Sequence, residues 1–231
     1  MKILAFDTTN NSVSVAISKG ERILAYNEEL RPSMQAETIV PMIEDTLKKA
    51  KLSYNQIDYL AVTNGPGSFT GIRIGLSVAK GILLSTAIKG IALSNFEFSH
   101  FRASTQIKNY EKIYIFLNAY RGQVYSQVFN QIGQATAPIL LSYEQAIELL
   151  EKEQGIIGCA GSGVEPIYQK IKNIENIIIL PRFARVKSMH ICKYLANKLL
   201  IGQTSPTIIE PLYIRSPDAK LPAAHYVNNQ L

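Results

Sequence analysis

Apolar runs and polar turns alternate in a regular order along the first hundred residues. Ile3–Asp7 is an apolar run that predicts a buried strand, and Ser12–Ile17 alternates with a period of two, as a half-buried strand does. A turn at residues 19–21 leads into a third strand, so the segment predicts a three-stranded antiparallel meander. The elements expected next are a strand over Ile23–Glu28, a helix over Met34–Ala50, a strand over Ile57–Thr63, a helix over Gly71–Ala87 and a short strand over Ile91–Leu93.

The second half of the chain repeats this order of elements. They are strands over Ile113–Asn118, Gln123–Phe129 and Ala137–Leu141, a helix over Ser142–Glu153 with Ser142 as N-cap, a strand over Gly155–Ala160, a helix near Pro166–Lys172, a strand over Ile177–Leu180 and a helix over Val186–Leu200. In the first half Asp7 ends one strand and Ser12 begins the next, and Asn118 and Gln123 stand in the same relation in the second. An internal duplication explains these matches.

Two βββαβα lobes that face each other across a cleft form the actin-like ATPase (ASKHA) fold, in which each lobe is ribonuclease-H-like. We predict this α/β fold, with one lobe over residues 1–103 and the other over residues 104–231, because polar residues gather near Phe101–Asn109. The last helix is expected to pack back on the first lobe. A fold of this kind does not by itself determine the function.

Composition narrows the class of protein. The chain has 231 residues, 47% of them hydrophobic and 18% charged, which is enough for a substantial core. Its two cysteines and three scattered histidines form neither a disulfide framework nor a metal-binding pattern. The apolar segment Gly81–Leu93 carries Lys89 and is too short to cross a bilayer, and Asp7 interrupts any signal-peptide core. We therefore expect a cytoplasmic protein without a membrane contact.

The net charge of +6 is unevenly distributed. No acidic residue occurs from Asn176 to Ile209, a stretch that contains Arg182, Arg185, Lys187, Lys193 and Lys198. Such a positive field is suited to phosphates or RNA. It is equally typical of a solvated helix face with cations near a helix C-terminus. No ladder of aromatic residues for base stacking accompanies the stretch, which favours the second interpretation.

Polar residues that fit a nucleotide site follow the first strand and recur in the second lobe. In a two-lobed ATPase the first hairpin, here Asp7, Thr8 and Thr9, meets the nucleotide phosphates and their metal. The alternative is an Asx or Ser/Thr turn that holds the hairpin. Residues Gly161, Ser162 and Gly163 border the adenosine side of such a cleft, or form a simple loop.

The second hairpin has no carboxylate at the positions that correspond to the first. Asn118 and Gln123 are amides, which neither hold Mg²⁺ by charge nor act as a base. A nucleotide-hydrolysing cleft needs anionic groups for both tasks. We therefore predict a vestigial nucleotide site at Asp7, Thr8, Thr9, Gly161, Ser162 and Gly163, with no catalytic residue and no metal site.

The loop Gly65–Gly71 is the most distinctive local motif. It lacks the lysine of a Walker A loop, and it follows the fourth strand rather than the first, unlike a dinucleotide fingerprint. Its backbone N–H groups lead into a helix N-terminus that tolerates anions, or the glycines serve a tight strand-to-helix connection. In the following helix Gly71, Gly75 and Ala79 form a stripe of small residues, which accepts either an internal element or a helix of another chain.

The segment Asn64–Gly75, which reads NGPGSFTGIRIG, resembles the TsaB (YeaZ) family of tRNA threonylcarbamoyladenosine biosynthesis proteins. The resemblance covers nearly the whole chain, including Glu37–Ile43, Ile91–Glu97, Asn118–Tyr125 and Pro211–Arg215. It implies a non-catalytic subunit that binds and supports a TsaD-type transferase, which modifies the adenosine 3′ to the anticodon in tRNAs that read codons starting with A. A TsaE-type ATPase joins the assembly, tRNA is the substrate of the complex, and ATP or ADP is bound in the complex while this chain requires no cofactor.

The resemblance also implies a partner interface. Members of the family form homodimers, or heterodimers with TsaD, through the helices near Glu37–Ala50 and Gly71–Ser85. The interface residues expected on this basis are Ile39, Met42, Ile43, Leu47, Gly71, Ile72, Ile74, Gly75, Val78, Ala79 and Ile82. This is the inter-chain interpretation of the stripe of small residues.

Departures from the family patterns bear on the chemistry. TsaD-like proteins carry metal-binding histidines in an H-x-x-x-H, and the aligned positions here are Asn95 and Ser99, with His100 one place off. The family pattern D-A-R-x-x-E-V-Y has amides at both acidic positions here, Asn118 and Gln123. Metal-dependent transfer by this chain is therefore not expected. Two alternatives stay open: a stand-alone actin-fold ATPase, kinase or peptidase that uses Asp7, and a tRNA-binding module that uses the stretch Arg182–Lys198.

Overall fold

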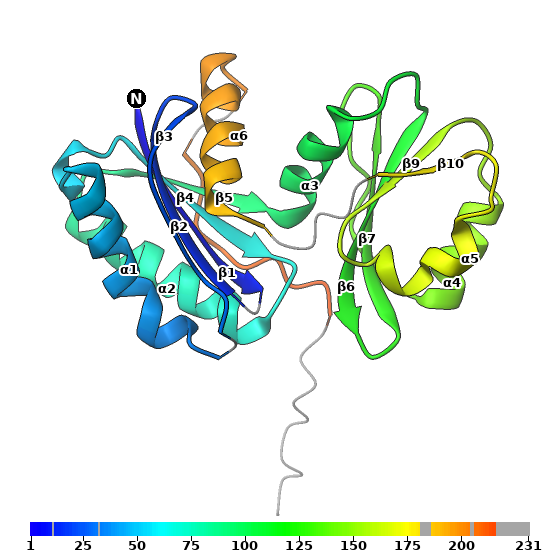
Figure 1. Cartoon of the computed structure of the whole chain (residues 1–231), viewed down its shortest axis with the longest axis horizontal. Coiled ribbons are helices and arrows are strands. Elements are labelled where there is room, and N and C mark those ends of the chain that lie inside the picture. The colour runs from blue at the N-terminus through cyan, green and yellow to red at the C-terminus, as the bar shows by residue number, and fades with distance from the viewer. Residues whose placement is uncertain (11, 32, 181–185, 204–205, 216–231) are drawn as a thin grey trace, which may run out of the picture.

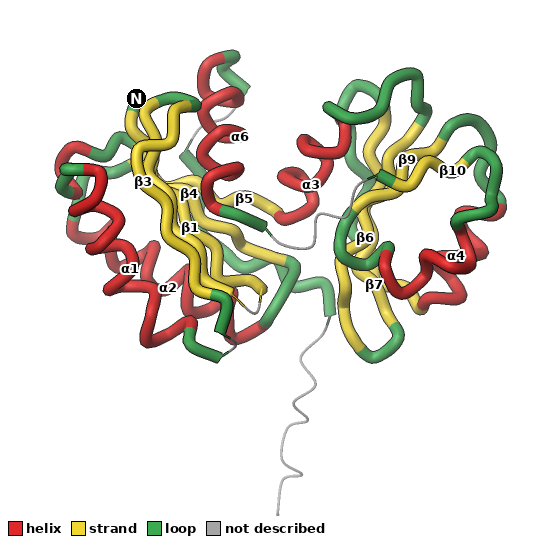
Figure 2. The backbone as a smooth tube through the Cα atoms, in the orientation of Figure 1, coloured by secondary structure: helices red, strands yellow, loops and turns green. Residues whose placement is uncertain are grey.

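Two five-stranded sheets, each flanked by helices, make up the computed structural model (Figure 1). The structure describes residues 1–10, 12–31, 33–180, 186–203 and 206–215. In Figure 2 the strands form two separate bodies, with helices on both outer flanks and between them. Within the described residues, no helix is both long and apolar enough to pass through a membrane.

The first sheet has the strand order β3-β2-β1-β4-β5. Its strands are β1 (Lys2–Asn10), β2 (Ser12–Lys19), β3 (Arg22–Glu29), β4 (Tyr59–Gly65) and β5 (Lys89–Ser94). Strand β1 pairs antiparallel with β2 and parallel with β4. The helices α1 (Gln35–Ala50) and α2 (Phe69–Ser85) cover the outer face of this sheet, and a short 3-10 helix, η1 (Tyr54–Gln56), precedes β4. Pro41 lies inside α1 and does not end it.

The second sheet has the order β10-β9-β6-β7-β8. Its elements are β6 (Lys112–Tyr120), β7 (Gln123–Asn130), β8 (Ile139–Ser142), α4 (Tyr143–Glu151), β9 (Ile157–Ala160), the 3-10 helix η2 (Glu165–Ile167), α5 (Tyr168–Ile171) and β10 (Ile177–Ile179). Ser142 caps α4 as predicted, because its hydroxyl accepts a hydrogen bond from the Gln145 N–H. Helices α4 and α5 cover the outer face.

The internal duplication is confirmed by the topology. Read from the third strand of each lobe, both sheets have the order three-two-one-four-five, with the first two pairs antiparallel and the last two parallel. The two βββαβα units are the lobes of the actin-like ATPase fold, as the sequence analysis predicts.

Two helices lie between the sheets, α3 (Asn95–Ser104) and α6 (Ser188–Leu200) (Figure 1). Helix α3 is absent from the sequence-based expectation because it buries opposite faces in different cores: Phe98 packs in the first lobe and Phe96 in the second. It therefore lacks a single apolar stripe. One local signal does mark its start, since Ser94 and Glu97 form a capping box.

Helix α6 packs on the inner face of the first sheet, the lobe on which the sequence analysis places it. Its residues Ile191, Cys192 and Leu195 are fully buried against the small side chains of Ala5 and Ala16. Small residues in the strands let the helix approach the sheet closely. The basic residues Lys187, Lys193 and Lys198 lie at or in α6, whereas Arg182 and Arg185 lie outside the described residues.

Residues 206–215 run from the first lobe to the second. The Thr207 N–H donates to the Gly90 carbonyl at the edge of β5, and the Leu212 N–H donates to the Asn64 carbonyl at 2.8 Å. At the far end the Arg215 guanidinium donates to the Gln123 side-chain oxygen at 2.5 Å. This C-terminal strap therefore covers the free edge of β5 and joins the two lobes.

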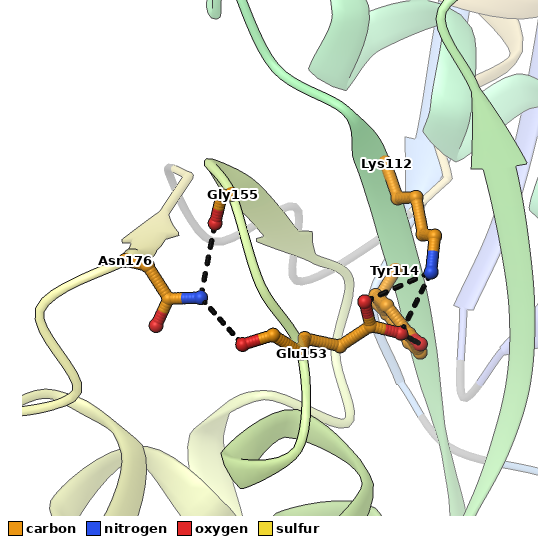
Figure 3. Close-up of polar contacts among 5 residues, drawn as sticks. All are labelled: Lys112, Tyr114, Glu153, Gly155 and Asn176. Atoms are coloured by element: carbon orange, nitrogen blue, oxygen red, sulfur yellow. Dashed lines mark hydrogen bonds and ion pairs between the residues drawn. The ribbon is translucent and has the colours of Figure 1, made fainter.

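A partly buried polar cluster surrounds the Glu153 side chain near the start of β6 (Figure 3). The Glu153 carboxylate accepts hydrogen bonds from Lys112 Nζ, at 2.8 and 3.0 Å, and from the Tyr114 hydroxyl. The Asn176 amide donates to the carbonyls of Glu153 and Gly155, both at 2.9 Å. The cluster thereby ties the end of α4 to β6 and to the segment before β10.

Candidate functional site

The Asp7 carboxylate, at the end of β1, is completely buried and bonded within its own lobe. It accepts hydrogen bonds from the Thr63 hydroxyl at 2.5 Å, the Thr9 hydroxyl at 2.6 Å, the Thr9 N–H at 3.2 Å and Asn10 Nδ2 at 3.3 Å. Burial raises the pKa of Asp7 above its usual value, and these four donors oppose that effect. The contact of the carboxylate with the N–H two residues on is an Asx turn. Asp7 therefore holds the hairpin together.

Thr8 is turned away from the cleft. Its hydroxyl donates to the Gly71 carbonyl at 2.7 Å, and its side chain is fully buried against α2. Of the six residues in the predicted nucleotide site, only Thr9 and Ser162 line a cavity between the lobes. Asp7, Thr8, Gly161 and Gly163 do not.

The glycine-rich loop after β4 passes directly over the end of β1. A β-carbon at Gly67 would stand 2.4 Å from the Thr9 carbonyl oxygen, and one at Gly71 would stand 2.0 Å from that of Thr8. Two of the loop donors are in use, since the Ser68 N–H donates to the Thr9 carbonyl and the Gly71 N–H to the Ser68 hydroxyl. Of the two interpretations of this loop, its close contact with the end of β1 therefore matches the tight strand-to-helix connection.

The second lobe repeats this contact. Gly161 has a φ of +103°, and a β-carbon there would stand 2.2 Å from the Phe116 carbonyl oxygen. The Gly163 N–H donates to the same carbonyl at 2.8 Å. In both lobes glycines let the loop after the fourth strand rest on the end of the first strand. The two glycines thus serve the contact of the loop with β6.

The stripe of small residues on α2 packs inside the chain. A β-carbon at Gly75 would stand 2.4 Å from the Thr8 hydroxyl, and Ala79 has no exposed surface. Of the two interpretations of this stripe, the contact with an internal element fits Gly71, Gly75 and Ala79, because they pack against β1 and β4.

Seven of the eleven predicted interface residues are buried in the core of the first lobe: Ile39, Ile43, Leu47, Gly71, Ile72, Gly75 and Ala79. The other four, Met42, Ile74, Val78 and Ile82, are half-buried against that core. Apolar side chains that α1 and α2 do expose were not predicted. They are Val40 (47% exposed), Phe69 (44%) and Leu84 (89%).

A cavity of about 180 Å³ lies where the two lobes meet. Both hairpins, both loops after the fourth strands, and α3 contribute to it. The described residues that line it are Thr9, Asn10, Pro66, Gly67, Ser68, Asn95, Phe98, Ser99, Leu117, Asn118, Tyr120, Ser162 and Val186. None of these described residues carries a charge.

Asn95 and Ser99, which the sequence analysis places at the two positions of an H-x-x-x-H, both line the cavity. Asn95 Nδ2 donates to the Thr9 hydroxyl at 2.8 Å and to the Pro66 carbonyl at 2.9 Å, so the side chain joins α3 to the first hairpin. Among the described residues no group of three or more His, Cys, Asp or Glu side chains is close enough to hold a metal ion. The described residues do not fit a magnesium-bound nucleotide, which needs anionic ligands for the metal.

The two amides of the second hairpin, Asn118 and Gln123, are both hydrogen-bonded. Asn118 Oδ1 accepts from the Tyr120 N–H at 2.8 Å, and the Asn118 N–H donates to the Ser162 hydroxyl at 3.1 Å. Gln123 does not line the cavity and instead accepts from Arg215. Tyr120 was not predicted as a site residue. It is 60% exposed and has a positive φ of 57°, which nothing in the sequence signals.

His100 and His190, the two histidines in the part of the chain that the structure describes, do not line this cavity. His100 stacks on Phe129 with a ring separation of 4.2 Å, and burial lowers its pKa to about 4. It lines a second cavity, of about 230 Å³, between α3, α6 and the turn after β7. Burial, together with the positive charges of Arg102, Lys193 and Lys187, also lowers the pKa of His190 to about 4. Both side chains are therefore neutral at pH 7.

The basic stretch is partly neutralised within the chain. Lys187 forms an ion pair with Glu28 at 3.4 Å, and Lys198 Nζ donates to the Gln203 side-chain oxygen at 3.1 Å. Both contacts are typical of a solvated helix face. The use of this stretch for tRNA stays a prediction.

Comparison with known proteins identifies the family. The family model described as "tRNA N6-adenosine threonylcarbamoyltransferase" (TsaD) matches residues 33–169. The "tRNA threonylcarbamoyladenosine biosynthesis protein TsaB" of Haemophilus influenzae is 28% identical over 229 residues, which cover 94% of each chain. The protein of the same name from Escherichia coli is 39% identical over 94 residues, or 41% of this chain and 40% of that one.

The fold is shared with a solved structure of a protein of the same type. YeaZ from Pseudomonas aeruginosa superimposes with a TM-score of 0.71 at 21% identity, over 92% of this chain and 99% of that one. The match therefore extends over both lobes and not only over the glycine-rich segment. The chain belongs to the TsaD family, and within it to the TsaB (YeaZ) proteins, which take part in tRNA threonylcarbamoyladenosine biosynthesis.

Proposed function

We propose that this chain is a non-catalytic subunit of the tRNA threonylcarbamoyladenosine machinery, which binds and supports a TsaD-type transferase. The transferase would modify the adenosine 3′ to the anticodon in tRNAs that read codons starting with A. The observation that carries the proposal is the neutral cleft: Asp7 is buried and bonded to residues of its own hairpin and of β4, and no described residue of the cavity is charged. A transferase or ATPase site needs anionic groups to hold its metal and to position the reacting water or amine.

The outer surface of α1 and α2 is the contact face that we assign to the partner. These helices lie on the flank of the first lobe that faces away from the second (Figure 1). Val40 and Leu84 expose apolar surface there, and Met42, Ile74, Val78 and Ile82 lie half-buried beneath it. Exposed apolar surface that continues into a core is typical of an interface.

An aromatic cluster extends this face at the start of α2. The rings of Phe69 and Tyr213 are 5.1 Å apart, and the Arg73 guanidinium lies 3.8 Å from the centre of the Phe69 ring. Arg73 Nε also donates to the Tyr213 hydroxyl at 3.2 Å, which joins the C-terminal strap to α2. Phe69 and Tyr213 remain 44% and 41% exposed. Exposed tyrosine and arginine side chains held in place by neighbours are common energetic centres of interfaces.

The same face serves self-association and TsaD binding, so the two states exclude each other. In the free chain it forms a homodimer, and the TsaD-type subunit replaces the second copy. A TsaE-type ATPase joins the TsaB–TsaD pair, tRNA is the substrate of that complex in the cytoplasm, and any ATP or ADP of the assembly is held without a contribution from this chain's cavity.

Light-scattering mass after gel filtration tests the proposal, on the chain alone and mixed with the TsaD homologue of the same organism. We expect a 1:1 species to replace the free chain. Leu84→Asp should weaken it at least tenfold, because the substitution places a charge in the apolar face. Leu200→Asp is the matched control, since Leu200 is 83% exposed at the end of α6 on another face.

Two results contradict the proposal. One is the absence of a complex, with or without nucleotide and the TsaE-type protein. The other is magnesium-dependent ATP turnover by the purified chain that Asp7→Ala abolishes, which would establish a stand-alone actin-fold enzyme. Loss of threonylcarbamoyladenosine from tRNA after deletion of the gene, restored by the wild-type chain, is the corresponding test in cells.

A further inference from the structure

The C-terminal strap, residues 206–215, has apolar contacts in both lobes. Ile209 is 6% exposed and belongs to the core that α1 and α2 form with the first sheet. Leu212 and Ile214 pack instead against the core of the second lobe. In Figure 1 the strap accordingly crosses from one lobe to the other. A change in the second lobe can therefore reach the first lobe through this segment.

Successive side chains near the end of the strap alternate between two surroundings. Leu212 and Ile214 contact the core of the second lobe, whereas Tyr213, between them, contacts α2. The Tyr213 ring lies 5.1 Å from that of Phe69, and its hydroxyl accepts a hydrogen bond from Arg73 Nε at 3.2 Å. Alternation of this kind is the property of an extended chain. The position of Tyr213 on α2 is thus tied to the packing of its two neighbours on the second lobe.

Asn64, at the end of β4, holds the middle of the strap with two hydrogen bonds. Its carbonyl accepts from the Leu212 N–H at 2.8 Å, and its Nδ2 donates to the Glu210 carbonyl at 2.9 Å. Gly65 allows this approach, because a β-carbon there would stand 3.0 Å from the Leu212 carbonyl oxygen. The docked strap therefore rests on the connection that leads from β4 into α2.

Arg215 fixes the far end of the strap to the second lobe. Its guanidinium donates to the Gln123 side-chain oxygen at 2.5 Å and lies 6.0 Å from the centre of the Tyr125 ring. Both of these neighbours belong to β7. A hydrogen bond with an ionised donor is stronger than one between neutral groups. The strap is therefore anchored on the lobe that does not carry α1 and α2.

We propose that the strap couples the partner face to the second lobe: the TsaD-type subunit binds the chain whose strap is docked, and the contact of Arg215 with Gln123 holds the strap in place. The inference rests on the proposed function, because it takes the outer surface of α1 and α2 as the binding face. Tyr213 is 41% exposed and reaches this face from the strap. A partner that binds one of two states loses apparent affinity in proportion as that state becomes less populated. A residue of the second lobe that the partner does not touch then controls the affinity.

Titration calorimetry of the full chain with the TsaD homologue of the same organism tests the coupling. Arg215→Ala should weaken the complex at least fivefold. Arg215→Lys should recover part of the lost affinity, because an ammonium group still donates to the Gln123 oxygen. Arg22→Ala is the matched control and should leave the affinity unchanged, since Arg22 is exposed on β3, at the edge of the first sheet opposite to β5 and the strap.

Hydrogen exchange of the free chain separates docking from a direct contact of Arg215 with the partner. An undocked strap loses the bond from the Leu212 N–H to the Asn64 carbonyl, so Arg215→Ala should speed exchange at Leu212 at least fivefold with no partner present. The Thr207 N–H, which donates to the Gly90 carbonyl in the first lobe, is the internal reference and should exchange at the wild-type rate. By reciprocity, the TsaD-type subunit should slow exchange at Leu212 in the wild-type chain.

The outcomes distinguish this inference from the proposed function. The wild-type chain forms the complex if the proposed function holds. Equal affinity of Arg215→Ala and the wild type would then overturn the coupling alone, and so would a weaker complex without faster exchange at Leu212. Absence of a complex with the wild-type chain would overturn both the proposed function and the coupling.

Discussion

Gly71 of α2 and Thr8 of β1 are in direct contact: the Thr8 hydroxyl donates to the Gly71 carbonyl at 2.7 Å, and a β-carbon at position 71 would stand 2.0 Å from the Thr8 carbonyl oxygen. The glycines of the most distinctive sequence segment therefore let one backbone rest on another. They resemble a phosphate-binding loop in composition only, because the strand end occupies the space where a ligand would sit. The second lobe uses Gly161 and Gly163 in the same way against Phe116.

Substitution of the glycines in α2 tests this contact. Gly71→Ala should lower the free energy of unfolding by about 2 kcal/mol or more, because the new methyl group overlaps a backbone oxygen that is fixed in a sheet. Gly81→Ala, in the same helix, has nothing within 4 Å of the added carbon and should raise it by up to about 1 kcal/mol, since alanine is the better helix former. Urea unfolding of both variants gives the comparison. Equal effects of the two substitutions would contradict the contact.

Elements that bury one face were predictable from the sequence. Helix α1 begins one residue from the predicted start, at Gln35, because Ile39, Ile43 and Leu47 form one apolar stripe that faces one sheet. Helix α3 escaped prediction because Phe96 and Phe98 enter different cores, so that its apolar residues follow no single period. Its capping box at Ser94 and Glu97 was the usable signal.

The candidate site was predictable only in part. The pattern located the hairpins and the loops that meet at the cleft, and Thr9 and Ser162 do line the cavity. The pattern did not show that the Thr63 hydroxyl, on the neighbouring strand, donates to Asp7 and helps to keep its carboxylate out of the cavity. That contact joins residues 56 positions apart. For the same reason the glycine stripe on α2 gave no sign of whether Thr8 or another chain would fill it.

The pH dependence of stability tests the environment of Asp7. Burial raises the pKa of Asp7 in the folded chain, so the folded state binds this proton more tightly than the unfolded state does. The contribution of Asp7 is therefore most favourable at acid pH and is lost as the pH rises through the raised pKa. Asp7→Asn removes this titration while it retains one oxygen that accepts from Thr63 and Thr9.

We therefore expect the difference in unfolding free energy between Asp7→Asn and the wild type to move in favour of the variant between pH 4 and pH 7. The measurement is chemical denaturation at several pH values, with Asp58→Asn as the control at a half-exposed carboxylate. A difference that moves the other way would mean that the four donors outweigh burial and that Asp7 is a stabilising anion.

The pKa of Glu153 is shifted in the opposite direction to that of Asp7. Burial acts to raise its pKa, but the donors Lys112 and Tyr114 outweigh burial, so that its pKa is lowered. Its stabilising contribution is therefore present above the unfolded pKa of a glutamate and is lost as the pH falls through the lowered folded value. Glu153→Gln should cost about 1–3 kcal/mol at pH 7 and less at pH 3. Thermal unfolding at both values checks this, with the exposed Glu151→Gln in α4 as control. An equal loss of stability at both pH values would mean that the negative charge of Glu153 does not contribute to stability.

Gln123 is an amide where the family pattern quoted in the sequence analysis has an acid, and its side chain contacts Arg215. The Arg215 guanidinium donates to the Gln123 oxygen at 2.5 Å and anchors the C-terminal strap to the second lobe. Gln123→Glu should convert this hydrogen bond into an ion pair and stabilise the docked strap by up to about 1 kcal/mol, because a partly exposed pair gains little more. Hydrogen exchange at the Leu212 N–H, which donates to Asn64 within the strap, reports the docking.

The gain should fall with added salt, since ions screen a pair that is not fully buried. It should also vanish in an Arg215→Ala background, where the new carboxylate has lost its partner, so a double-mutant cycle isolates the pair. A gain that persists without Arg215 would assign the effect of the carboxylate to another neighbour in β7. If the gain depends on Arg215 alone, the amide of Gln123 holds the strap more weakly than a carboxylate would but does not release it. Both side chains have an oxygen that accepts a hydrogen bond from the Arg215 guanidinium.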